Sequence, residues 1–434
     1  MRVVMVGAGY VGLVSGACFA EFGADVTCVD VDQDRIDRLR AGEIPIYEPG
    51  LADLVGRNAA SGRLRFVTGP GAEVGAADLV FIAVGTPARR GDGHADLRYV
   101  YRAATMIAPH LRDYTVLVTK STVPVGTARE VRRLVGEACP EADFDVASNP
   151  EFLREGSAIE DFMRPDRVVL GVESARAEGL LRELYRPLNL IETPIVATGI
   201  ESAELTKYAC NAFLATKVSF INEIAALCEA TGADVHAVAR GMGLDRRIGR
   251  RFLHPGPGYG GSCLPKDIAA LARMAQERDV PARIVEATLA VNGAQRERMR
   301  DKIRGALAGD VSGKRIGVLG LTFKPETDDM REAPSLHVLP PLIDEGANVR
   351  AHDPQGMDEA AAWLPESVRY CADPYEVAKT ADAVVLMTEW NAYRGLDLER
   401  VRDSMCGRVF VDLRNVYEPD AMRALGFRYC GVGR

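Results

Sequence analysis

The chain has 434 residues, of which 47% are hydrophobic and 26% are charged, and its formal net charge at pH 7 is −8. This length is too great for one ordinary core, so two or three domains are expected. The composition is typical of a soluble globular protein, and the negative charge argues against nucleic acid or an anionic membrane as the main partner. An anionic small ligand would have to be held by a few placed Arg and Lys residues.

Nine cysteines are scattered along the chain without a Cys-x-x-Cys pair. This pattern argues against a disulfide framework and a cysteine zinc site, and no metal site is predicted. The N-terminus begins like a first strand rather than a signal peptide, and no apolar run approaches the length of a membrane span. We therefore expect a cytoplasmic protein.

The first 30 residues predict a dinucleotide-binding unit. An apolar strand at 3–6 is followed by a glycine turn, a helix through Ala20 and a second apolar strand at 26–29. The turn has the glycine fingerprint of such units, in which one glycine permits the tight turn, one lets pyrophosphate approach the backbone and one lets helix and strand pack closely, here Gly7, Gly9 and Gly12.

Asp30 ends the second of these strands, where its carboxylate would accept hydrogen bonds from the adenosine ribose. The same charge would repel a 2′-phosphate, so the sequence favours NAD over NADP. Further strands are expected at 79–84 and 115–119, and strand ends of this kind line the cofactor crevice of a parallel sheet.

The middle of the chain changes character. Helical spacing persists from Glu201 to Ala230 without Gly or Pro, and Gly232 is expected to end the helix. So long a helix suggests a spine between two domains or a packing face for a second subunit.

The segment 255–267 predicts a glycine-rich loop that delivers Cys263 to the start of a helix, with Pro265 in the first turn and Lys266 nearby. The positive end of a helix dipole and a neighbouring cation stabilise a thiolate, which is the nucleophilic form of cysteine. The alternative is a buried structural cysteine, as most free cysteines are.

The last part repeats the rhythm of the first, with apolar strands expected at 315–319, 348–351, 383–387 and 409–413. It lacks the triple glycine and carries Lys324 instead, so it either holds a different phosphate ligand or is purely structural. We predict an α/β fold with two Rossmann-like doubly wound domains joined by a long central helix and a helical dimerisation region. The expected domains are 1–197 for NAD, 198–305 for the central helices and 306–434 for the second Rossmann-like unit.

Several motifs occur in one order along essentially the whole chain: the glycine fingerprint, Ser-Thr-Val-Pro-Val-Gly at 121–126, Asn-Pro-Glu-Phe-Leu-Arg-Glu-Gly at 149–156, the Cys263 loop and Leu-Thr-Phe-Lys-Pro at 321–325. Together they resemble the UDP-glucose/GDP-mannose dehydrogenase family. The resemblance is greatest to its bacterial members acting on UDP-glucose, and smaller to those acting on GDP-mannose or UDP-N-acetylmannosamine.

The resemblance implies an NAD-dependent, four-electron oxidation of a nucleotide-sugar primary alcohol to a carboxylate, with two NAD reduced per substrate and UDP-glucuronate as the product. Cys263 would attack an aldehyde to give a thiohemiacetal, and a second oxidation would give a thioester that water cleaves.

The other catalytic roles also come from the resemblance. Lys207 and Asn211, four apart on the long helix, would form an oxyanion site, although such a pair alone is more often a solvated polar face. Asp267 with Lys207 would order a water, Glu151 would be the general base and Thr122 would help to hold water and the nicotinamide. Glu151 and Glu155 could also be ordinary surface carboxylates.

Carried over position by position, the cofactor residues beyond the glycines are Val11, Asp30, Arg35, Thr86, Thr122, Glu155, Lys266 and Arg331. Arg35 is expected at the adenosine end. The nucleotide sugar would be bound by Phe152, Leu153, Arg154, Glu155, Lys207, Asn211, Arg247, Phe252, Leu253, His254, Pro255, Gly256, Tyr259, Gly260, Lys324 and Arg414, with Lys324 and the glycine loop on the diphosphate. Arg247 resembles an arginine that reaches a neighbouring subunit's site, which implies a homodimer or a larger assembly.

One departure concerns the substrate. Leu264 follows the cysteine where many UDP-glucose enzymes carry phenylalanine, and leucine is found there in GDP-mannose relatives. The loop at 254–259 resembles the bacterial UDP-glucose type, so UDP-glucose is preferred. The alternatives are the same chemistry on GDP-mannose or UDP-N-acetylmannosamine, or a non-catalytic sensor of nucleotide sugar or NAD.

Overall fold

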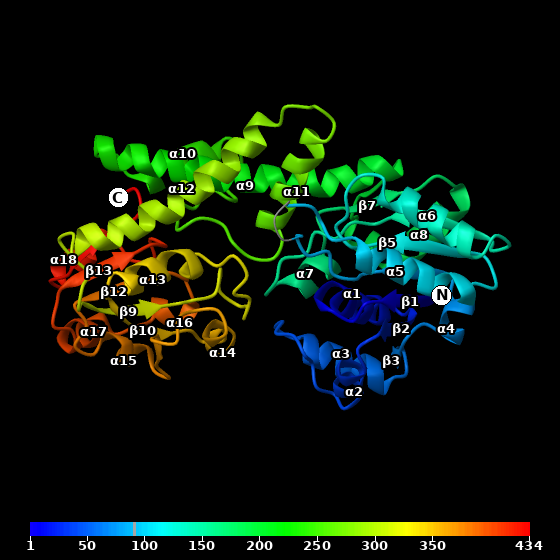
Figure 1. The fold of residues 1–434 in the computed structure, drawn as a ribbon, viewed down its shortest axis with the longest axis horizontal. Helices are drawn as coiled ribbons and strands as arrows, with labels where there is room; N and C mark the ends of the chain where they lie inside the picture. The colour runs from blue at the N-terminus through cyan, green and yellow to red at the C-terminus, as the bar shows by residue number, and fades with distance from the viewer. Residues whose placement is uncertain (90–92) are drawn as a thin grey trace. The chain divides into compact units, whose positions relative to one another are not determined.

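The computed structural model describes residues 1–89 and 93–434 and divides the chain into two compact units, 1–210 and 211–434 (Figure 1). No helix in the described part of the chain combines the length and the apolar composition that a bilayer crossing needs. The first unit contains β1 (Arg2–Val6), α1 (Tyr10–Glu21), β2 (Asp25–Asp30), α2 (Gln33–Arg40), α3 (Leu51–Ala60), β3 (Leu64–Thr68), α4 (Ala72–Gly75), β4 (Leu79–Ile82), α5 (Arg98–Ile107), η1 (Ala108–His110), β5 (Thr115–Thr119), α6 (Thr127–Ala138), β6 (Phe144–Ser148), α7 (Ala158–Met163), β7 (Val168–Gly171), α8 (Ala175–Leu184), η2 (Arg186–Ile191) and β8 (Ile195–Thr198).

The strands of the first unit form one eight-stranded sheet in the order β3-β2-β1-β4-β5-β6-β7-β8. All neighbours pair in parallel except β6 and β7, which meet antiparallel at Ser148 and Gly171. The first six strands therefore have the 3-2-1-4-5-6 order of the dinucleotide-binding fold.

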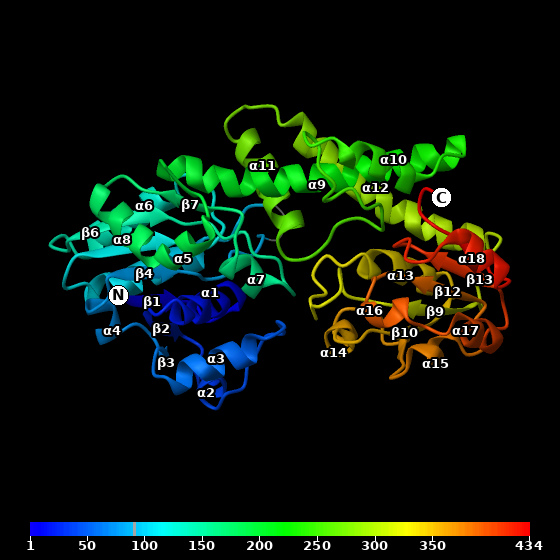
Figure 2. The ribbon, with the colours of Figure 1, turned by 180° about the vertical axis from the view of Figure 1, so that it is seen from behind.

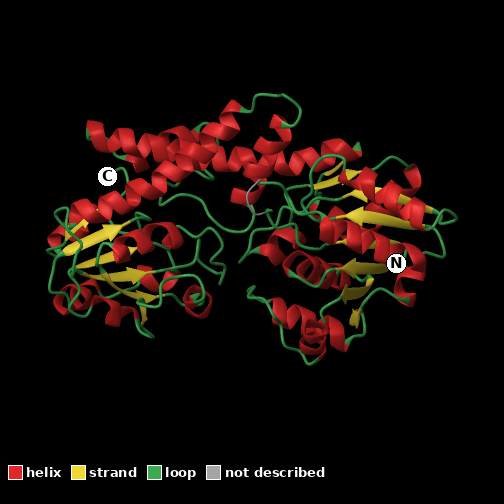
Figure 3. Ribbon diagram, viewed as in Figure 1, coloured by secondary structure: helices red, strands yellow, loops and turns green. Residues whose placement is uncertain are grey.

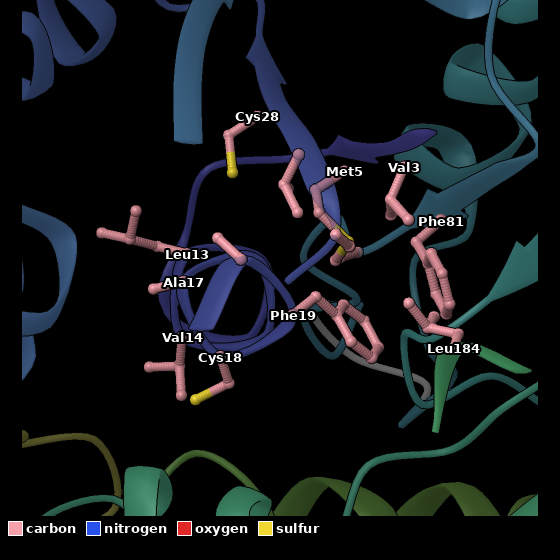
Figure 4. Packing of buried hydrophobic residues seen from close by; sticks show 14 of the residues in the cluster. Val3, Met5, Leu13, Val14, Ala17, Cys18, Phe19, Cys28, Phe81 and Leu184 are labelled. Atoms are coloured by element: carbon pink, nitrogen blue, oxygen red, sulfur yellow. The ribbon is translucent and has the colours of Figure 1, made fainter. Parts of the chain in front are cut away.

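Both faces of this sheet are buried, as a parallel sheet requires. Along β1, Val3 and Met5 join one apolar cluster and Val4 and Val6 join another on the opposite face. Figure 4 shows the first cluster, where Phe19 of α1 points toward Phe81 of β4 at a ring separation of 5.2 Å. This core holds the carboxyl ends of β1, β2 and β4 in fixed register, and those ends carry the predicted cofactor residues.

Helix α9 (Ile200–Thr231) confirms the predicted long helix, and Gly232 follows it with a φ of +75°. Within the second unit, α12 (Arg283–Ala306) lies beside the C-terminal part of α9 in both views (Figures 1 and 2). The hydroxyl of Ser219 on α9 donates to the carbonyl of Thr288 on α12 at 3.2 Å.

The second unit continues with α10 (Val235–Leu244), α11 (Leu264–Gln276), α12, β9 (Arg315–Leu319), α13 (Ser335–Asp344), β10 (Asn348–His352), α14 (Met357–Ala361), β11 (Arg369–Tyr370), α15 (Pro374–Ala378), β12 (Ala383–Leu386), α16 (Asn391–Arg394), α17 (Leu398–Ser404), β13 (Val409–Asp412), α18 (Pro419–Ala424) and β14 (Arg428–Cys430). Its sheet has the order β11-β10-β9-β12-β13-β14 and is parallel throughout the described pairs (Figure 3).

The second sheet repeats the 3-2-1-4-5-6 order of the first six strands of the other sheet, and it too is covered on both faces. Val385 of β12 lies in one cluster, and Val384 of the same strand lies in the other. The predicted class of two Rossmann-like sheets and a long central helix is confirmed.

In the second sheet Asp353 follows β10 and accepts hydrogen bonds from the backbone N–H groups of Leu321 and Thr322 at 2.7 and 3.1 Å. This carboxylate therefore holds the turn after β9.

Candidate active site

A cavity of about 500 Å³ opens at the carboxyl ends of β1, β2 and β4 in the first unit. The glycine fingerprint forms one wall. Gly7 has a φ of +105°, and a Cβ on Gly12 would lie 1.8 Å from the Gly7 carbonyl oxygen, so both positions require glycine. A Cβ on Gly9 would meet no atom within 4 Å, so this backbone is open to a ligand.

Asp30 lies at the end of β2 and lines the same cavity. Its carboxylate accepts hydrogen bonds from the N–H groups of Ala8 and Asp32 at 2.8 and 3.0 Å, and from the Arg35 guanidinium at 3.1 Å. Arg35 therefore lies at the Asp30 end of the cavity. Asp32 and, from α5, Tyr99, Arg102 and Met106 also line it; the sequence reasoning missed these residues.

The loops after β4 and β5 are joined at the predicted threonines. The Thr86 hydroxyl donates to the carbonyl oxygen of Thr122 at 2.9 Å, and Thr86 is buried. Val11 lies half-buried in the first turn of α1, and Glu155 is also half-buried. Arg154 is exposed and forms an ion pair with Asp161 at 2.5 Å.

Glu151 and Lys207 form a buried ion pair within the first unit. The Lys207 Nζ lies 2.9 Å from Glu151 Oε1, and the Leu153 N–H donates to Glu151 Oε2 at 2.6 Å. Burial opposes the charge on Glu151, but Lys207 and that N–H outweigh it and lower the pKa of the carboxyl. Glu151 is therefore ionised near neutral pH, and it is not a surface carboxylate.

The ring of Phe152 has two cations close to it. The Arg167 guanidinium is 3.6 Å from its centroid and Lys207 Nζ is 5.4 Å away. This cation–π contact gives Lys207 a second fixed neighbour on the loop that carries Glu151.

In the second unit, Cys263 is the residue immediately before α11, and Pro265 lies in the first turn, as predicted. The thiol is half-buried, and its Sγ lies 3.4 Å from the Ser262 hydroxyl. The sulfur therefore lies at the positive end of a thirteen-residue helix. A fully buried structural cysteine is excluded by this partial exposure.

Asp267 is buried one turn into α11 and joins two other predicted residues. Its carboxylate accepts from the Asn211 side-chain amide at 2.6 Å and from Lys266 Nζ at 2.6 Å. The contact to Asn211 connects α11 to α9 beside the cysteine, and Lys266, predicted for the cofactor, is here the partner of Asp267.

The glycine loop is held by a row of polar side chains on α12 and α9 that the sequence reasoning missed. Asn292 accepts from the Tyr259 N–H and donates to the Tyr259 carbonyl, at 2.9 and 3.1 Å. Gln295 donates to the Gly256 carbonyl at 2.7 Å, and Asn222 accepts from the Gly256 N–H at 2.9 Å. Asn292 and Gln295 lie three residues apart on α12, a spacing that does not distinguish them from an ordinary polar helix face.

Close packing explains two of the loop glycines. A Cβ on Gly260 would lie 2.3 Å from the Glu332 carbonyl oxygen, and one on Gly261 would lie 2.7 Å from the Phe323 ring. The Gly261 N–H donates to the Arg331 carbonyl at 2.9 Å. These glycines therefore let the Cys263 loop lie against the segments after β9.

The other residues predicted for the nucleotide sugar lie around this loop. Phe252 has a φ of +64°, Pro255 is buried, and Lys324 Nζ lies 5.3 Å above the Phe323 ring. Arg414 donates to the carbonyls of Met387 and Phe323 at 2.7 and 2.8 Å.

Three predicted residues have different surroundings. Leu253 and His254 line a separate cavity of about 600 Å³ with Asp234, His236, Arg240 and Arg434. Arg331 pairs with Asp329 at 2.8 Å. Among the described residues there is no group of three or more His, Cys, Asp or Glu side chains that could hold a metal ion.

Comparison with known proteins identifies the family. Family models match the chain three times: the NAD binding domain at residues 1–189, the central domain at 201–294 and the UDP binding domain at 317–419. The chain belongs to the UDP-glucose/GDP-mannose dehydrogenase family. It is 57% identical over 436 residues to a UDP-glucose 6-dehydrogenase of Rhizobium meliloti, covering 100% of both chains.

Solved structures of this family show the same architecture. A UDP-glucose dehydrogenase from Pyrobaculum islandicum matches with a TM-score of 0.91 at 42% identity, over 99% of this chain and 97% of that one. A GDP-mannose dehydrogenase from Pseudomonas aeruginosa matches with a TM-score of 0.56 at 32% identity, over 100% of both chains.

As a member of this dehydrogenase family the chain is an enzyme that uses NAD. The first cavity fits that cofactor. It presents an open glycine backbone where pyrophosphate needs N–H donors, and a carboxylate where the ribose needs an acceptor.

Proposed function

We propose that this protein oxidises UDP-glucose to UDP-glucuronate through a covalent Cys263 intermediate. The half-buried thiol at the start of α11 carries the proposal, because a nucleophilic sulfur is what a second oxidation at the same carbon requires. The substrate choice rests on the 57% identity to the Rhizobium enzyme. When bound, NAD supplies the hydride acceptor for each of the two oxidations, so two NAD are reduced per substrate.

Cys263 acts after the first oxidation has converted the C6 alcohol to an aldehyde. The thiolate attacks the aldehyde carbon, and the new C–S bond gives a thiohemiacetal whose carbon still carries a hydrogen. The second oxidation converts this adduct to a thioester. Water then adds to the thioester, the C–S bond breaks, and the carboxylate and the free thiolate are released.

Other charged and polar side chains stabilise the oxyanion, order the water and accept its proton in this proposal. Lys207 and Asn211, which share a face of α9, donate to the substrate oxygen that becomes negative. Asp267 holds the Asn211 amide at 2.6 Å and, with Lys207, orders a water. Glu151 accepts a proton from the hydrolytic water, for which its lowered pKa keeps it ionised. Thr122, with its loop bonded to Thr86, helps to hold that water and the nicotinamide.

The ligand residues keep their predicted roles in this proposal. The glycine fingerprint, Asp30 and Arg35 bind the adenosine and pyrophosphate half of NAD, and Lys324 binds the diphosphate of the sugar nucleotide. Because no disulfide joins any of the cysteines in the described residues, we also infer that the protein works in the reducing cytoplasm.

We further propose a homodimer that pairs along α9. Phe213, Phe220 and Leu227 recur every seven residues, and they are 66%, 45% and 58% exposed. A stripe of large apolar side chains at this spacing is typical of a helix that packs against a partner helix. Arg247 lies in the turn after α10 with its side chain 90% exposed beside Asp245, and it is available to a neighbouring subunit.

A substrate panel tests the proposed activity. The purified protein is mixed with NAD and, in turn, UDP-glucose, GDP-mannose and UDP-N-acetylmannosamine, and NADH absorbance is followed. We expect turnover with UDP-glucose and two NADH for each UDP-glucuronate formed. Turnover with GDP-mannose alone would contradict the substrate, one NADH per product would contradict the four-electron reaction, and binding without NADH would favour a sensor.

Asp30→Asn tests the cofactor assignment. The amide keeps the size of the side chain but removes the charge that accepts from Ala8 and Arg35. We expect KM for NAD to rise about tenfold and the preference for NAD over NADP to narrow by a similar factor, since Arg35 is freed to meet a 2′-phosphate. Steady-state kinetics with both cofactors measure this. Asp37→Asn, on an exposed position of α2, is the control, and an unchanged preference in Asp30→Asn would refute the ribose role.

A further inference from the structure

A second buried lysine lies in the first unit, and the reaction described above does not use it. Lys120 follows β5 directly and is 3% exposed. Its Nζ donates to the side-chain and main-chain oxygens of Asn149 at 3.1 and 3.4 Å, and to the Tyr185 hydroxyl at 3.5 Å. The ring centroid of Phe162 lies 5.7 Å away. All these partners are neutral, so no carboxylate bonds directly to this ammonium in the described contacts.

The charged neighbours of Lys120 belong to the proposed catalytic machinery. Lys120 interacts electrostatically with Glu151 and with Lys207, and these three charges share the buried interior of the first unit. The other titratable groups that face it are Cys18 of α1 and Tyr185. Burial raises the pKa of Cys18 to about 12 and raises that of Tyr185 further, so both are neutral. The cluster therefore carries two positive charges and one negative charge.

A buried ammonium without a bonded anion is costly, and such groups gather at functional sites. Burial lowers the pKa of Lys120 to about 8, and Glu151 is the largest influence that raises it. The ammonium form thus persists at neutral pH with Glu151 as its electrostatic counterpart.

Lys120 is also fixed in place relative to the loop that carries Glu151. Asn149 lies two residues before Glu151. Its side-chain oxygen accepts hydrogen bonds from both the Lys120 ammonium and the Tyr185 hydroxyl, and the bond from Tyr185 is 2.6 Å long. The Asn149 amide nitrogen donates to the Val169 carbonyl at 2.9 Å. Lys207, in contrast, pairs with Glu151 and also donates to the substrate oxyanion in the proposed reaction. The oxyanion therefore competes with Glu151 for the Lys207 ammonium.

We propose that Lys120 is a positioning residue of the reaction: a fixed buried cation that keeps the Glu151 carboxylate ionised while Lys207 serves the substrate oxyanion. The inference rests on the proposed function of Glu151 and Lys207. Lys120 acts through Glu151 and through Asn149, and it needs no contact with the substrate.

The test is the pH dependence of Lys120→Met. A nearby cation lowers the pKa of a carboxyl, so its removal raises the pKa of Glu151, and activity that needs the ionised form is lost at a higher pH. We expect the acid limb of the kcat–pH profile to move to higher pH, while KM for UDP-glucose and for NAD stays within about threefold. Lys120→Arg keeps the positive charge, so its acid limb should lie at the same pH as that of the wild type.

Two controls separate charge from structure. Tyr185→Phe removes one partner of Lys120 and Asn149 but no charge, and it should leave the acid limb in place. Lys379→Met makes the same substitution at an exposed position. An acid limb of Lys120→Met equal to that of the wild type, or an equal upward shift in Tyr185→Phe, would overturn the proposal.

A direct titration keeps the inference testable whatever the turnover assay gives. Protein labelled with [13C]glutamate is titrated by NMR, with Glu151→Gln assigning the Glu151 carboxyl signal. Its pKa should rise in Lys120→Met and remain low in Lys120→Arg. If Lys120→Met does not fold, Lys120→Gln, which retains a donor for Asn149, replaces it. Absence of wild-type turnover on the panel would refute the proposed function, whereas an unmoved Glu151 signal would refute the role of Lys120.

Discussion

Replacing Cys263 with serine is expected to lower the rate of UDP-glucuronate formation by about 10³-fold or more. Serine matches the size of cysteine but is a far weaker nucleophile at neutral pH, so the covalent adduct that the second oxidation needs does not form. NAD and UDP-glucose should still bind within a few-fold of the wild-type affinity, since the side chain is not an anchor for either ligand. Product formation by chromatography and binding by calorimetry measure the two effects.

The matched control is Cys406→Ser, because Cys406 is an exposed free thiol in the second unit. It should retain wild-type turnover. Near-normal turnover of Cys263→Ser would rule out the thioester route. Mass spectrometry after a slow substrate offers an independent check, because an acyl adduct should be found on the peptide that contains Cys263.

Asp267→Asn is expected to lower kcat by about 10² to 10³-fold with a small change in either KM. The carboxylate is 1% exposed and accepts from both Asn211 and Lys266 at 2.6 Å. Asparagine has only one side-chain oxygen, so its NH2 group would face one of these two donors and that hydrogen bond would be lost. The Asn211 amide would then no longer be held in one orientation. Stability should also fall by about 1.5 to 3 kcal/mol, because hydrogen bonds to a charged group are lost.

Steady-state kinetics and thermal unfolding measure these two effects separately. Asp279→Asn is the control: Asp279 is exposed and has a φ of +53°, a conformation that asparagine adopts readily. An Asp267→Asn variant that unfolds at a lower temperature but keeps kcat within about threefold of the wild-type value would show that Asp267 is a structural residue only.

Local signals predicted the elements of this fold well. The glycine fingerprint between two apolar strands predicted the first βαβ unit, and α9 begins and ends within one residue of the predicted helix. The position of Cys263 before α11 was also predictable, because proline in a first turn and helical spacing after it are short-range features. These features depend on φ, ψ and side-chain direction within a few residues, so a single chain segment carries them.

The roles of the loop glycines were less predictable. The sequence indicates a flexible loop made for a ligand, whereas Gly260 and Gly261 are also required by the Glu332 backbone and the Phe323 ring. The Asn292 and Gln295 contacts to this loop come from α12, which is distant in sequence. Nothing in the spacing of these amides distinguishes them from an ordinary polar helix face.

By itself, then, the sequence determined the two Rossmann-like sheets, the long helix, the glycine turn after the first strand and the position of Cys263 at a helix start. Only the tertiary structure decided which charges meet: the Glu151–Lys207 pair at 2.9 Å, the Asp267 bonds to Asn211 and Lys266, and the burial of Lys120 behind Asn149. The physical reason is that a strand or helix forms from local geometry, whereas the ionisation of a side chain depends on burial and on neighbours that only long-range packing brings together.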